Sequence, residues 1–212
     1  MPVTRELAWR VFAKEFNDSS YMQKENGDKM PSYLITPLGA KINRVFIVGV
    51  VTEVENIGSE GKPNWRARIA DRTGTFFVYA GQYDPEVAQQ LITIEPPAFV
   101  AVVGKPRIFR PENGTTLVSI RPERVQEVSK DVCENWILET CRHMKTRLDA
   151  VKQALELAPP TKDNLEALGF DPNLAEGVVM AVENYDHKNI DMDQYFDTMV
   201  SELNALTETK AN

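Results

Sequence analysis

The hydrophobic positions between residues 43 and 129 fall into five short runs that are rich in β-branched residues. Turn-forming segments separate them, and they cover residues 44–54, 65–70, 75–80, 99–109 and 115–125. Apolar runs of this length, bounded by clusters of Gly, Pro, Asn and Asp, are typical of β-strands. A segment at 85–93 has a helical pattern and lies between the third and fourth runs.

The order of these elements predicts a five-stranded oligonucleotide/oligosaccharide-binding (OB) barrel, in which a short helix follows the third strand. Strands this short are not stable alone, and closing them into a barrel leaves no exposed edge. Gly49 and Gly104 interrupt strand patterns, where a bulge or bend helps a small barrel to coil. The sequence Asp-Arg-Thr-Gly at 71–74 is more typical of a tight turn between strands than of a ligand site.

The segment before the barrel, residues 1–42, predicts a helix and then an irregular connection. Residues 5–16 place apolar side chains such as Val11 and Phe12 on one face of a helix. We expect this helix to pack on the barrel, and a partner-binding helix is the alternative. Residues 17–41 are polar and rich in turn formers, with a short extended piece at 33–35.

A long helix is predicted after the barrel, over residues 130–158. Its apolar positions are spaced 4, 3, 4, 3 and 4 residues apart, with Trp136 beside them, and they are Ile137, Cys141, Met144, Leu148, Val151 and Leu155. This is a heptad pattern, and about 28 residues would extend roughly 42 Å, further than a small barrel can cover. The pattern therefore predicts an oligomerisation helix, and the alternative is a helix covered by the C-terminal segment.

The last part of the chain, residues 161–212, predicts three further helices at 163–168, 174–185 and 193–206. The charge of the chain is −7, with 24 basic and 31 acidic residues. From Ser129 onward there are 8 basic and 16 acidic residues, whereas residues 41–128 hold 11 and 10. This acidic helical unit is either an interaction segment or an ordinary solvated surface.

Several classes of protein are excluded by what the sequence lacks. The two cysteines, Cys133 and Cys141, form no Cys-x-x-Cys pair and are too far apart on a helix for a disulfide. No phosphate-binding loop, dinucleotide-binding motif or nucleophile motif occurs. No apolar run approaches a membrane span, and the N-terminus does not resemble a secretory signal. We expect a cytoplasmic protein that is not an enzyme and uses no cofactor or metal.

Candidate binding residues lie on the second and third strands, which form the usual binding face of OB barrels. Strand alternation directs Arg66 and Arg68 outward beside Phe77 and Tyr79. Arginines next to aromatic rings suit single-stranded nucleic acid, because rings stack on bases and arginines contact phosphates. Further candidates flank this face, and they are Trp65, Lys105, Arg107, Phe109, Arg110 and Arg121. Outward Arg and Tyr are also ordinary surface residues, and Trp65 alternatively packs in the core.

Several sequence segments of the chain together match the pattern of a known family. The longest of them is Trp-Arg-Ala-Arg-Ile-Ala-Asp-Arg-Thr-Gly-Thr-Phe at 65–76. Shorter ones are Arg-Val-Phe-Ile-Val-Gly at 44–49, Tyr-Ala-Gly-Gln-Tyr at 79–83 and Val-Val-Gly-Lys-Pro at 102–106, and Arg-Val-Phe-Ala at 10–13 and Asn-Trp-Ile-Leu at 135–138 fit with them. In these segments the chain resembles the archaeal replication protein A-associated proteins, small subunits that accompany the archaeal single-stranded DNA-binding protein. The resemblance covers roughly residues 5–151.

This resemblance implies an OB barrel in a heteromeric complex of DNA replication and repair. It implies that the helix at 137–155 packs against helices of other replication protein A subunits. Large subunits of the family usually carry a Cys-rich zinc element, which this chain lacks, so it resembles an accessory subunit. The main expectation is single-stranded DNA binding. One alternative is a protein-interaction scaffold with little DNA contact, in which the barrel face or the acidic tail recruits replisome proteins, and another is an RNA- or transfer-RNA-binding module.

Overall fold

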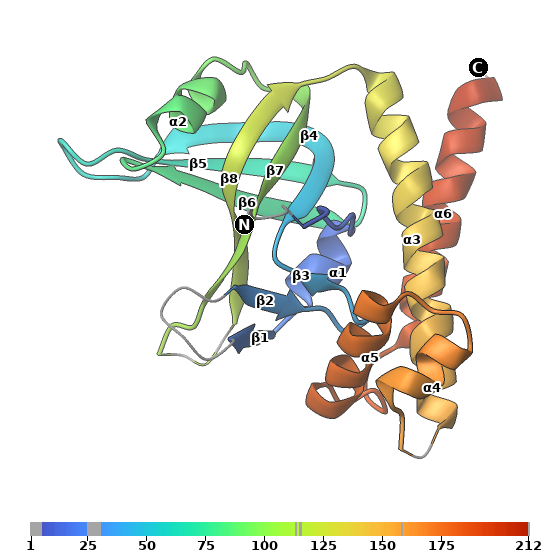
Figure 1. The fold of residues 1–212 in the computed structure, drawn as a ribbon. Helices are drawn as coiled ribbons and strands as arrows, with labels where there is room; N and C mark the ends of the chain where they lie inside the picture. Colours follow the sequence, from blue (N-terminus) through green and yellow to red (C-terminus); the bar gives the residue numbers. More distant parts are fainter. Residues whose placement is uncertain (1–5, 25–30, 113, 115, 158, 212) are drawn as a thin grey trace.

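The centre of the molecule is a closed barrel of five strands (Figure 1). A computed structural model describes the chain except for residues 1–5, 25–30, 113, 115, 158 and 212. The barrel order is β4-β5-β6-β8-β7, with strands β4 (Val45–Asn56), β5 (Asn64–Asp71), β6 (Gly74–Gly81), β7 (Ala98–Phe109) and β8 (Leu117–Glu127). Helix α2 (Pro85–Ile92) packs against β6 and β8. Order and boundaries confirm the predicted OB barrel.

Alternating side chains of the strands fill the barrel. Ala67 and Ile69 of β5 and Phe76 and Val78 of β6 are completely buried, as the apolar alternation predicts. The parallel pairing of Val78 with the buried Ile120 joins β6 to β8 and closes the barrel. Residues next to these positions on each strand must therefore face outward.

Glycine permits the bend of β7 where it meets β8. The pairing register shifts between Val103 and Gly104. A Cβ atom at Gly104 would lie 2.5 Å from the carbonyl oxygen of Arg121, so only glycine allows this close approach. Gly49 is similar, because its Cβ would lie 2.6 Å from the carbonyl oxygen of Ala70. The register shift at Gly104 matches the bulge that the sequence predicts, whereas Gly49 lies in regular pairing with Val100 and permits a close backbone approach.

The N-terminal helix is shorter than predicted, and the expected helix over residues 5–16 is wrong for most of its described length. Helix α1 covers only Ala13–Asn17. Before it, the Trp9 N–H donates to the Arg44 carbonyl oxygen at 2.9 Å, and the Phe46 N–H donates to the Trp9 carbonyl oxygen at 2.8 Å. The start of β4 lies outside its pairing with β5, so the extended segment satisfies backbone groups that would otherwise lack partners.

Three short strands form a second sheet in the segment that the sequence suggests is an irregular connection. They are β1 (Tyr21–Lys24), β2 (Ser32–Ile35) and β3 (Lys41–Ile42), paired in the order β1-β2-β3. The predicted extended piece at 33–35 lies in β2. Two of the three strands were not expected, because short polar strands carry almost no apolar periodicity.

The long helix α3 (Lys130–Glu156) packs against two C-terminal helices of the same chain. These are α5 (Pro172–Asn184) and α6 (Met192–Ala211), and α6 runs antiparallel to α3 (Figure 1). Helix α4 (Lys162–Ala167) precedes α5. The long helix and the three helices predicted after it are confirmed.

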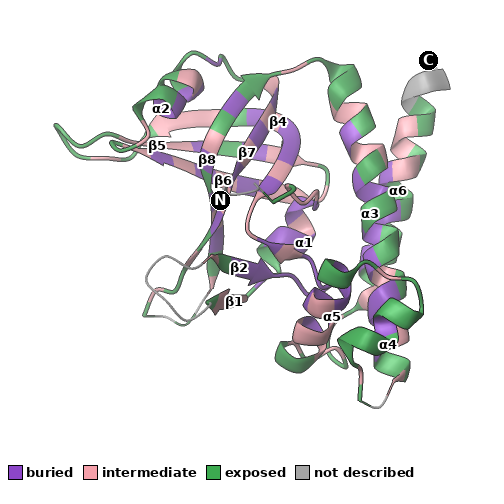
Figure 2. Cartoon of the chain, viewed as in Figure 1, coloured by how far each residue is buried: buried purple, intermediate pink, exposed green. Residues whose placement is uncertain are grey.

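The heptad positions of α3 are largely covered within the chain, as Figure 2 shows. Trp136, Cys141, Met144 and Val151 are buried, and Ile137 and Leu148 are half-buried while Leu155 is exposed. The Cys141 thiol lies 3.8 Å from the Met199 carbonyl oxygen of α6. The alternative of a helix covered by the C-terminal segment therefore describes this fold. Packing of this helix against a partner chain stays a prediction.

One main core joins the barrel to the elements around it. Val11 and Phe12 from the N-terminal segment, Met144 from α3, and Tyr195 and Met199 from α6 belong to the same buried cluster as the barrel residues. The helical C-terminal part therefore packs on the barrel in this structure. Within the described residues, no helix combines the length and the apolar character that crossing a membrane requires.

Candidate nucleic-acid interface

The predicted arginines and aromatic rings lie together on the outward surface of β5 and β6. Arg66 pairs across the strands with Tyr79, and Arg68 pairs with Phe77. The Arg68 guanidinium lies 5.6 Å from the centre of the Phe77 ring, and that of Arg66 lies 6.0 Å from it. The two rings are half-buried and Arg68 is exposed. Cation–π contacts of this kind hold the arginines against a ring face.

Two glutamates of the neighbouring strand β4 lie opposite the two arginines and form ion pairs with them. Glu55 is opposite Arg66 and Glu53 is opposite Arg68. The Arg68 Nε lies 2.9 Å from a Glu53 carboxylate oxygen, and Arg66 forms an ion pair with Glu55. The hydrogen bond to Glu55 raises the pKa of Arg66 above its ordinary value. The centre of the face is thus aromatic and close to electrically neutral.

Glu53 and Glu55 are residues of this face that the sequence did not single out. The sequence does contain a signal for them. Glu53 and Glu55 occupy alternate positions at the end of the first predicted strand, so both side chains lie on the same face of it. That strand lies beside β5 in any OB barrel. A register of β4 against β5 was needed to place each carboxylate opposite an arginine.

The basic residues of β7 and β8 extend the same surface. Lys105 pairs with Arg121, and Arg107 pairs with Ser119. Val78 of β6 pairs in parallel with Ile120 of β8. The residues that follow them, Tyr79 and Arg121, are therefore neighbours on the two strands. Arg107 and Arg121 are exposed and Lys105 is half-buried; among the described residues, none of the three forms an ion pair. These cations remain available to phosphate groups.

The remaining candidates have separate surroundings. The Phe109 ring is 62% exposed at the end of β7, a position suited to stacking. The Arg110 guanidinium donates to the Ser20 carbonyl oxygen at 2.8 Å, so it connects the β7–β8 loop to β1. Trp65 belongs to the inward row of β5 and packs against the main core, which favours the core-packing alternative over a stacking role.

The turn between β5 and β6 is structural, as the sequence predicts. Asp71 accepts hydrogen bonds from the backbone N–H groups of Thr73 and Gly74 at 2.7 and 3.0 Å. Its second oxygen accepts from the Ala13 N–H at 2.8 Å, at the start of α1. Burial raises the pKa of this carboxyl, with the hydrogen bonds opposing the change. The turn thereby fixes α1 against the barrel.

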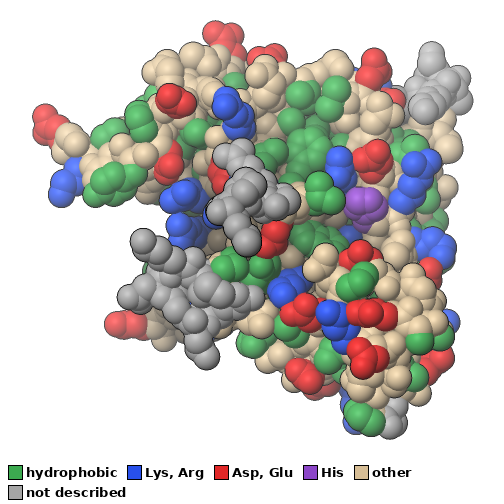
Figure 3. All heavy atoms as spheres, in the orientation of Figure 1, with side chains coloured by type: hydrophobic (Ala, Val, Ile, Leu, Met, Phe, Trp, Pro, Cys, Tyr) green, Lys and Arg blue, Asp and Glu red, His purple; other side chains and the backbone are tan. Residues whose placement is uncertain are grey.

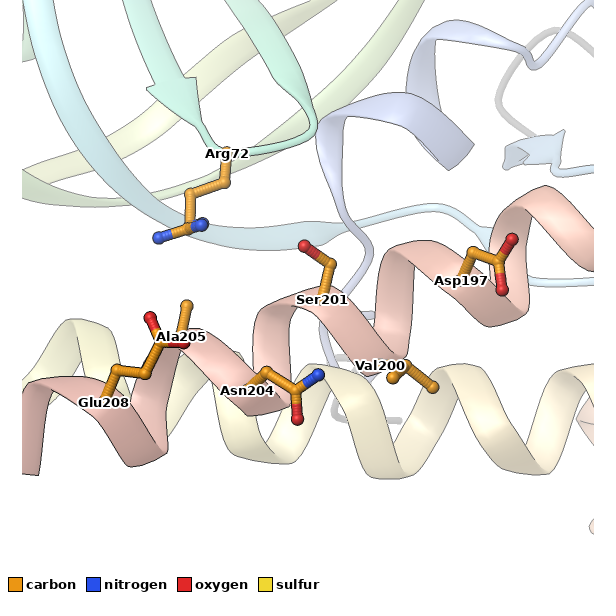
Figure 4. A pocket seen from close by; sticks show the side chains of 7 residues that line it. All are labelled: Arg72, Asp197, Val200, Ser201, Asn204, Ala205 and Glu208. Atoms are coloured by element: carbon orange, nitrogen blue, oxygen red, sulfur yellow. The ribbon is translucent and has the colours of Figure 1, made fainter.

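A shallow hollow of about 310 Å³ lies between this turn and α6. Figure 4 shows the Arg72 side chain extending from the turn toward the helix, on the side where Ser201 and Ala205 lie. Its guanidinium forms an ion pair with Glu202 at 3.3 Å. The contacts fit helix docking rather than ligand recognition. Across the residues that the structure describes, no group of three or more His, Cys, Asp and Glu side chains could hold a metal ion.

Comparison with known proteins gives distant structural neighbours. No family model matches the chain, and no curated protein matches it. The chain is similar to OBody NL8 bound to hen egg-white lysozyme, with 16% identity and a TM-score of 0.35 over 41% of this chain and 94% of that chain.

Two other neighbours are natural proteins. The second single-stranded DNA-binding protein (SSBb) from Mycobacterium smegmatis shares 16% identity and a TM-score of 0.35 over 41% of this chain and 86% of its own. Asparaginyl-tRNA synthetase from Pyrococcus horikoshii shares 14% and a TM-score of 0.33 over 56% of this chain and 34% of its own. The OB assignment rests on strand order and closure, not on these neighbours.

Proposed function

We propose that this chain is an OB-fold accessory subunit of a replication protein A-like complex and that it binds single-stranded DNA on the outward surface of β5, β6, β8 and β7. The observation that carries the proposal is the adjacency of Arg66, Arg68, Phe77 and Tyr79 on two neighbouring strands. Stacking on such rings contributes roughly 1–3 kcal/mol per base. The resemblance to archaeal replication protein A-associated proteins supports the same role.

Binding would depend more on stacking than on charge. Glu53 and Glu55 already pair with the two central arginines, so new phosphate contacts would come mainly from Lys105, Arg107 and Arg121. Each contact to single-stranded DNA adds roughly −0.7 to the slope of log K against log salt. Three contacts correspond to a slope of about −2, which is shallow for a DNA-binding protein.

The test is fluorescence anisotropy of labelled oligo-dT with the purified chain, at low and moderate salt. The double variant Arg66→Ala, Tyr79→Ala is expected to weaken binding at least about tenfold, because it removes one stacking ring and one cation. The matched control is Arg142→Ala, Phe196→Ala, which removes the same kinds of side chain from exposed positions of α3 and α6. Absence of binding by the folded wild-type chain at low salt would refute direct DNA contact.

The second candidate function is a protein-interaction scaffold for the replication machinery. The paired charges on the face and the excess of acidic residues after Ser129 favour it. Assembly through residues 137–155, which the resemblance implies, would require α5 and α6 to move away from α3. Apolar association of this kind should be insensitive to salt, so a salt-resistant complex without DNA affinity would support the scaffold.

A further inference from the structure

A groove of about 910 Å³ lies beside the barrel, where the N-terminal segment, β4, β7, α3 and α5 meet. Its lining includes the apolar side chains of Trp9, Phe46 and Val103, and that of Leu7, which is 92% exposed. Figure 3 shows hydrophobic side chains between the barrel and the helical part, with charged side chains around them. The described lining shares no residue with the proposed DNA surface. Exposed apolar surface rimmed by polar groups is typical of an interaction site.

The strand backbone in this groove is already hydrogen-bonded. Phe46 of β4 pairs with Val103 of β7, and the Phe46 N–H donates to the Trp9 carbonyl oxygen at 2.8 Å. At these residues an extended partner segment therefore finds no free strand edge to pair with. A helix satisfies its own backbone hydrogen bonds and presents one apolar face. The groove is thus better suited to a helix than to an added strand.

The ion pairs beside the groove present their acidic ends to solvent. Arg10 forms an ion pair with Glu139 at 3.1 Å, and the two side chains are 30% and 49% exposed. Lys41 forms an ion pair with Glu176 at 2.6 Å, and these side chains are 11% and 33% exposed. In both pairs the carboxylate is more exposed than the cation, so an approaching partner meets negative charge first.

The other charged residues of the lining add to this negative character. Glu6 and Asp171 are exposed, and among the described residues neither of them forms an ion pair. Glu6 accepts a hydrogen bond from the Tyr33 hydroxyl at 2.6 Å, which leaves its charge uncompensated. Arg147 is 1% exposed and pairs with Glu15 at 2.6 Å, so it brings no positive charge to the surface.

The exposed imidazole of His143 also lines the groove. Burial lowers the pKa of His143, the charges of Arg147 and Arg10 lower it further, and Glu139 opposes the change. The ring is therefore neutral near pH 7 and does not offset the carboxylates.

We propose that this groove binds a basic amphipathic helix of a partner protein. The apolar face of the helix covers Phe46 and Val103, and burial of this surface drives the association. Its Lys and Arg side chains lie at the carboxylates of Glu6, Glu139 and Asp171. Charge complementarity of this kind selects a basic helix over an acidic one. The same carboxylates disfavour a nucleic acid here, so this role is independent of DNA binding by the barrel face.

The test uses three labelled helical peptides of equal length, built from Leu and Lys, from Leu and Glu, or from Ala and Lys. Fluorescence anisotropy with the purified full chain at moderate salt measures their affinities. The Leu–Lys peptide is expected to bind at least about tenfold more tightly than either of the others. Equal affinity for the Leu–Glu peptide would exclude charge complementarity, and equal affinity for the Ala–Lys peptide would exclude apolar contact. Either result, or no binding of the Leu–Lys peptide, overturns the proposal.

A pair of charge variants separates the groove from the net charge of the chain, which is −7. Glu6→Gln, Glu139→Gln removes two carboxylates at the groove and is expected to weaken binding of the Leu–Lys peptide about threefold to tenfold. Glu156→Gln, Glu183→Gln makes the same change in net charge at exposed positions of α3 and α5 and should bind as the wild type does. The same loss in both variants would assign the affinity to net charge and contradict the site.

Two further measurements locate the bound peptide. Val103→Trp places a large ring in the groove and should weaken binding at least about tenfold, whereas Val200→Trp on exposed α6 should not. The imidazole signals of His143 and His187, the two histidines of the chain, are followed by NMR, and His187→Gln assigns them. Saturating Leu–Lys peptide should shift the signals of His143 and leave those of His187 in place. Unshifted His143 signals, or full affinity in a folded Val103→Trp variant, would place the peptide outside the groove and refute the inference.

Discussion

Single charged residues decide how this barrel face can bind. Arg66 and Arg68 point outward as the alternation of β5 predicts, but each meets a glutamate of β4. Exposed ion pairs of this kind contribute little to stability, about 0–1 kcal/mol. For the proposed DNA binding their larger effect is on recognition, because a phosphate would have to compete with a carboxylate that is already in place.

The double variant Glu53→Gln, Glu55→Gln should therefore bind single-stranded DNA more tightly than the wild type. Releasing two arginines for phosphate contact should also steepen the salt slope by up to about 1.4. Fluorescence anisotropy over a salt series measures both quantities. The control Glu156→Gln, Glu183→Gln makes the same change in net charge at exposed positions of α3 and α5; equal tightening in the control would assign the effect to net charge alone.

At the scale of elements, glycine backbone contacts dock α5 on the small sheet. A Cβ atom at Gly177 would lie 2.1 Å from the carbonyl oxygen of Gly39. Gly39 itself has φ +81° in the turn between β2 and β3. The Tyr185 hydroxyl, just after α5, donates to the Ile35 carbonyl oxygen at 2.6 Å. Helix and sheet thus touch through backbone, without room for a side chain.

Gly177→Ala is expected to destabilise the chain by roughly 1–3 kcal/mol, because overpacking forces helix and turn apart. In a helix without this close contact, replacing glycine by alanine would stabilise the chain. A loss of stability would therefore show that the contact between Gly177 and Gly39 is present. Urea unfolding followed by circular dichroism measures it. Gly81→Ala is the control, since the nearest atom to its added Cβ lies 3.9 Å away. A stabilised Gly177→Ala would show that α5 is not held this closely.

The docking of α6 on the β5–β6 turn depends on a buried carboxyl. Burial raises the pKa of Glu202 from 4.5 to about 6, with Asp71 adding to the rise and Arg72 opposing it. The folded chain therefore binds this proton more tightly than the unfolded chain does. The stabilising contribution is fully present below pH 4.5 and is lost as pH rises through about 6.

Glu202→Gln should remove this loss, so that its free energy of unfolding falls less between pH 4.5 and 6.5 than that of the wild type, by on the order of 1 kcal/mol. Denaturant unfolding at several pH values measures the difference. Glu208→Gln changes an exposed residue of the same helix and should follow the wild-type curve. If the free energy of unfolding depended on pH in the same way in the wild type and in Glu202→Gln, the raised pKa of the Glu202 carboxyl would be contradicted.

At the scale of the whole molecule, the C-terminal helices decide whether α3 is available to partners. Met144 and Cys141 are buried between the barrel and α6. Burial raises the pKa of Cys141 to about 12 and that of Cys133 to about 11. Both thiols are therefore poor nucleophiles near neutral pH, and their reactivity reports how α6 covers the helix.

Alkylation of Cys141 by iodoacetamide at pH 8 should be slow in the intact chain. Met199→Asp, which buries a charge where α6 meets the core, should release α6 and speed alkylation at least about tenfold. Phe196→Asp, at a 53% exposed position of the same helix, is the control. Mass spectrometry after digestion separates the two cysteines. Fast alkylation of Cys141 in the wild type would restore the hypothesis that this helix is open for assembly.

The sequence alone determined the barrel, its strand order and its turn at 71–74, because those features follow from local alternation and turn chemistry. It also determined which of Arg66, Arg68, Phe77 and Tyr79 face outward, since alternation depends only on neighbouring residues. The three C-terminal helices were likewise predictable from their periodicity and start signals.

Only the tertiary structure decided what covers each apolar face and what opposes each charge. The apolar pattern of residues 5–12 suits a helix, but free backbone groups at the start of β4 favour an extended segment. The heptad pattern of α3 suits a partner chain, but α6 of the same chain covers much of it. Glu53 and Glu55 reach the arginines through strand register. The periodicity of apolar residues shows that one face of a helix or strand is buried. Which other segment covers that face depends on long-range packing, which the local sequence pattern does not contain.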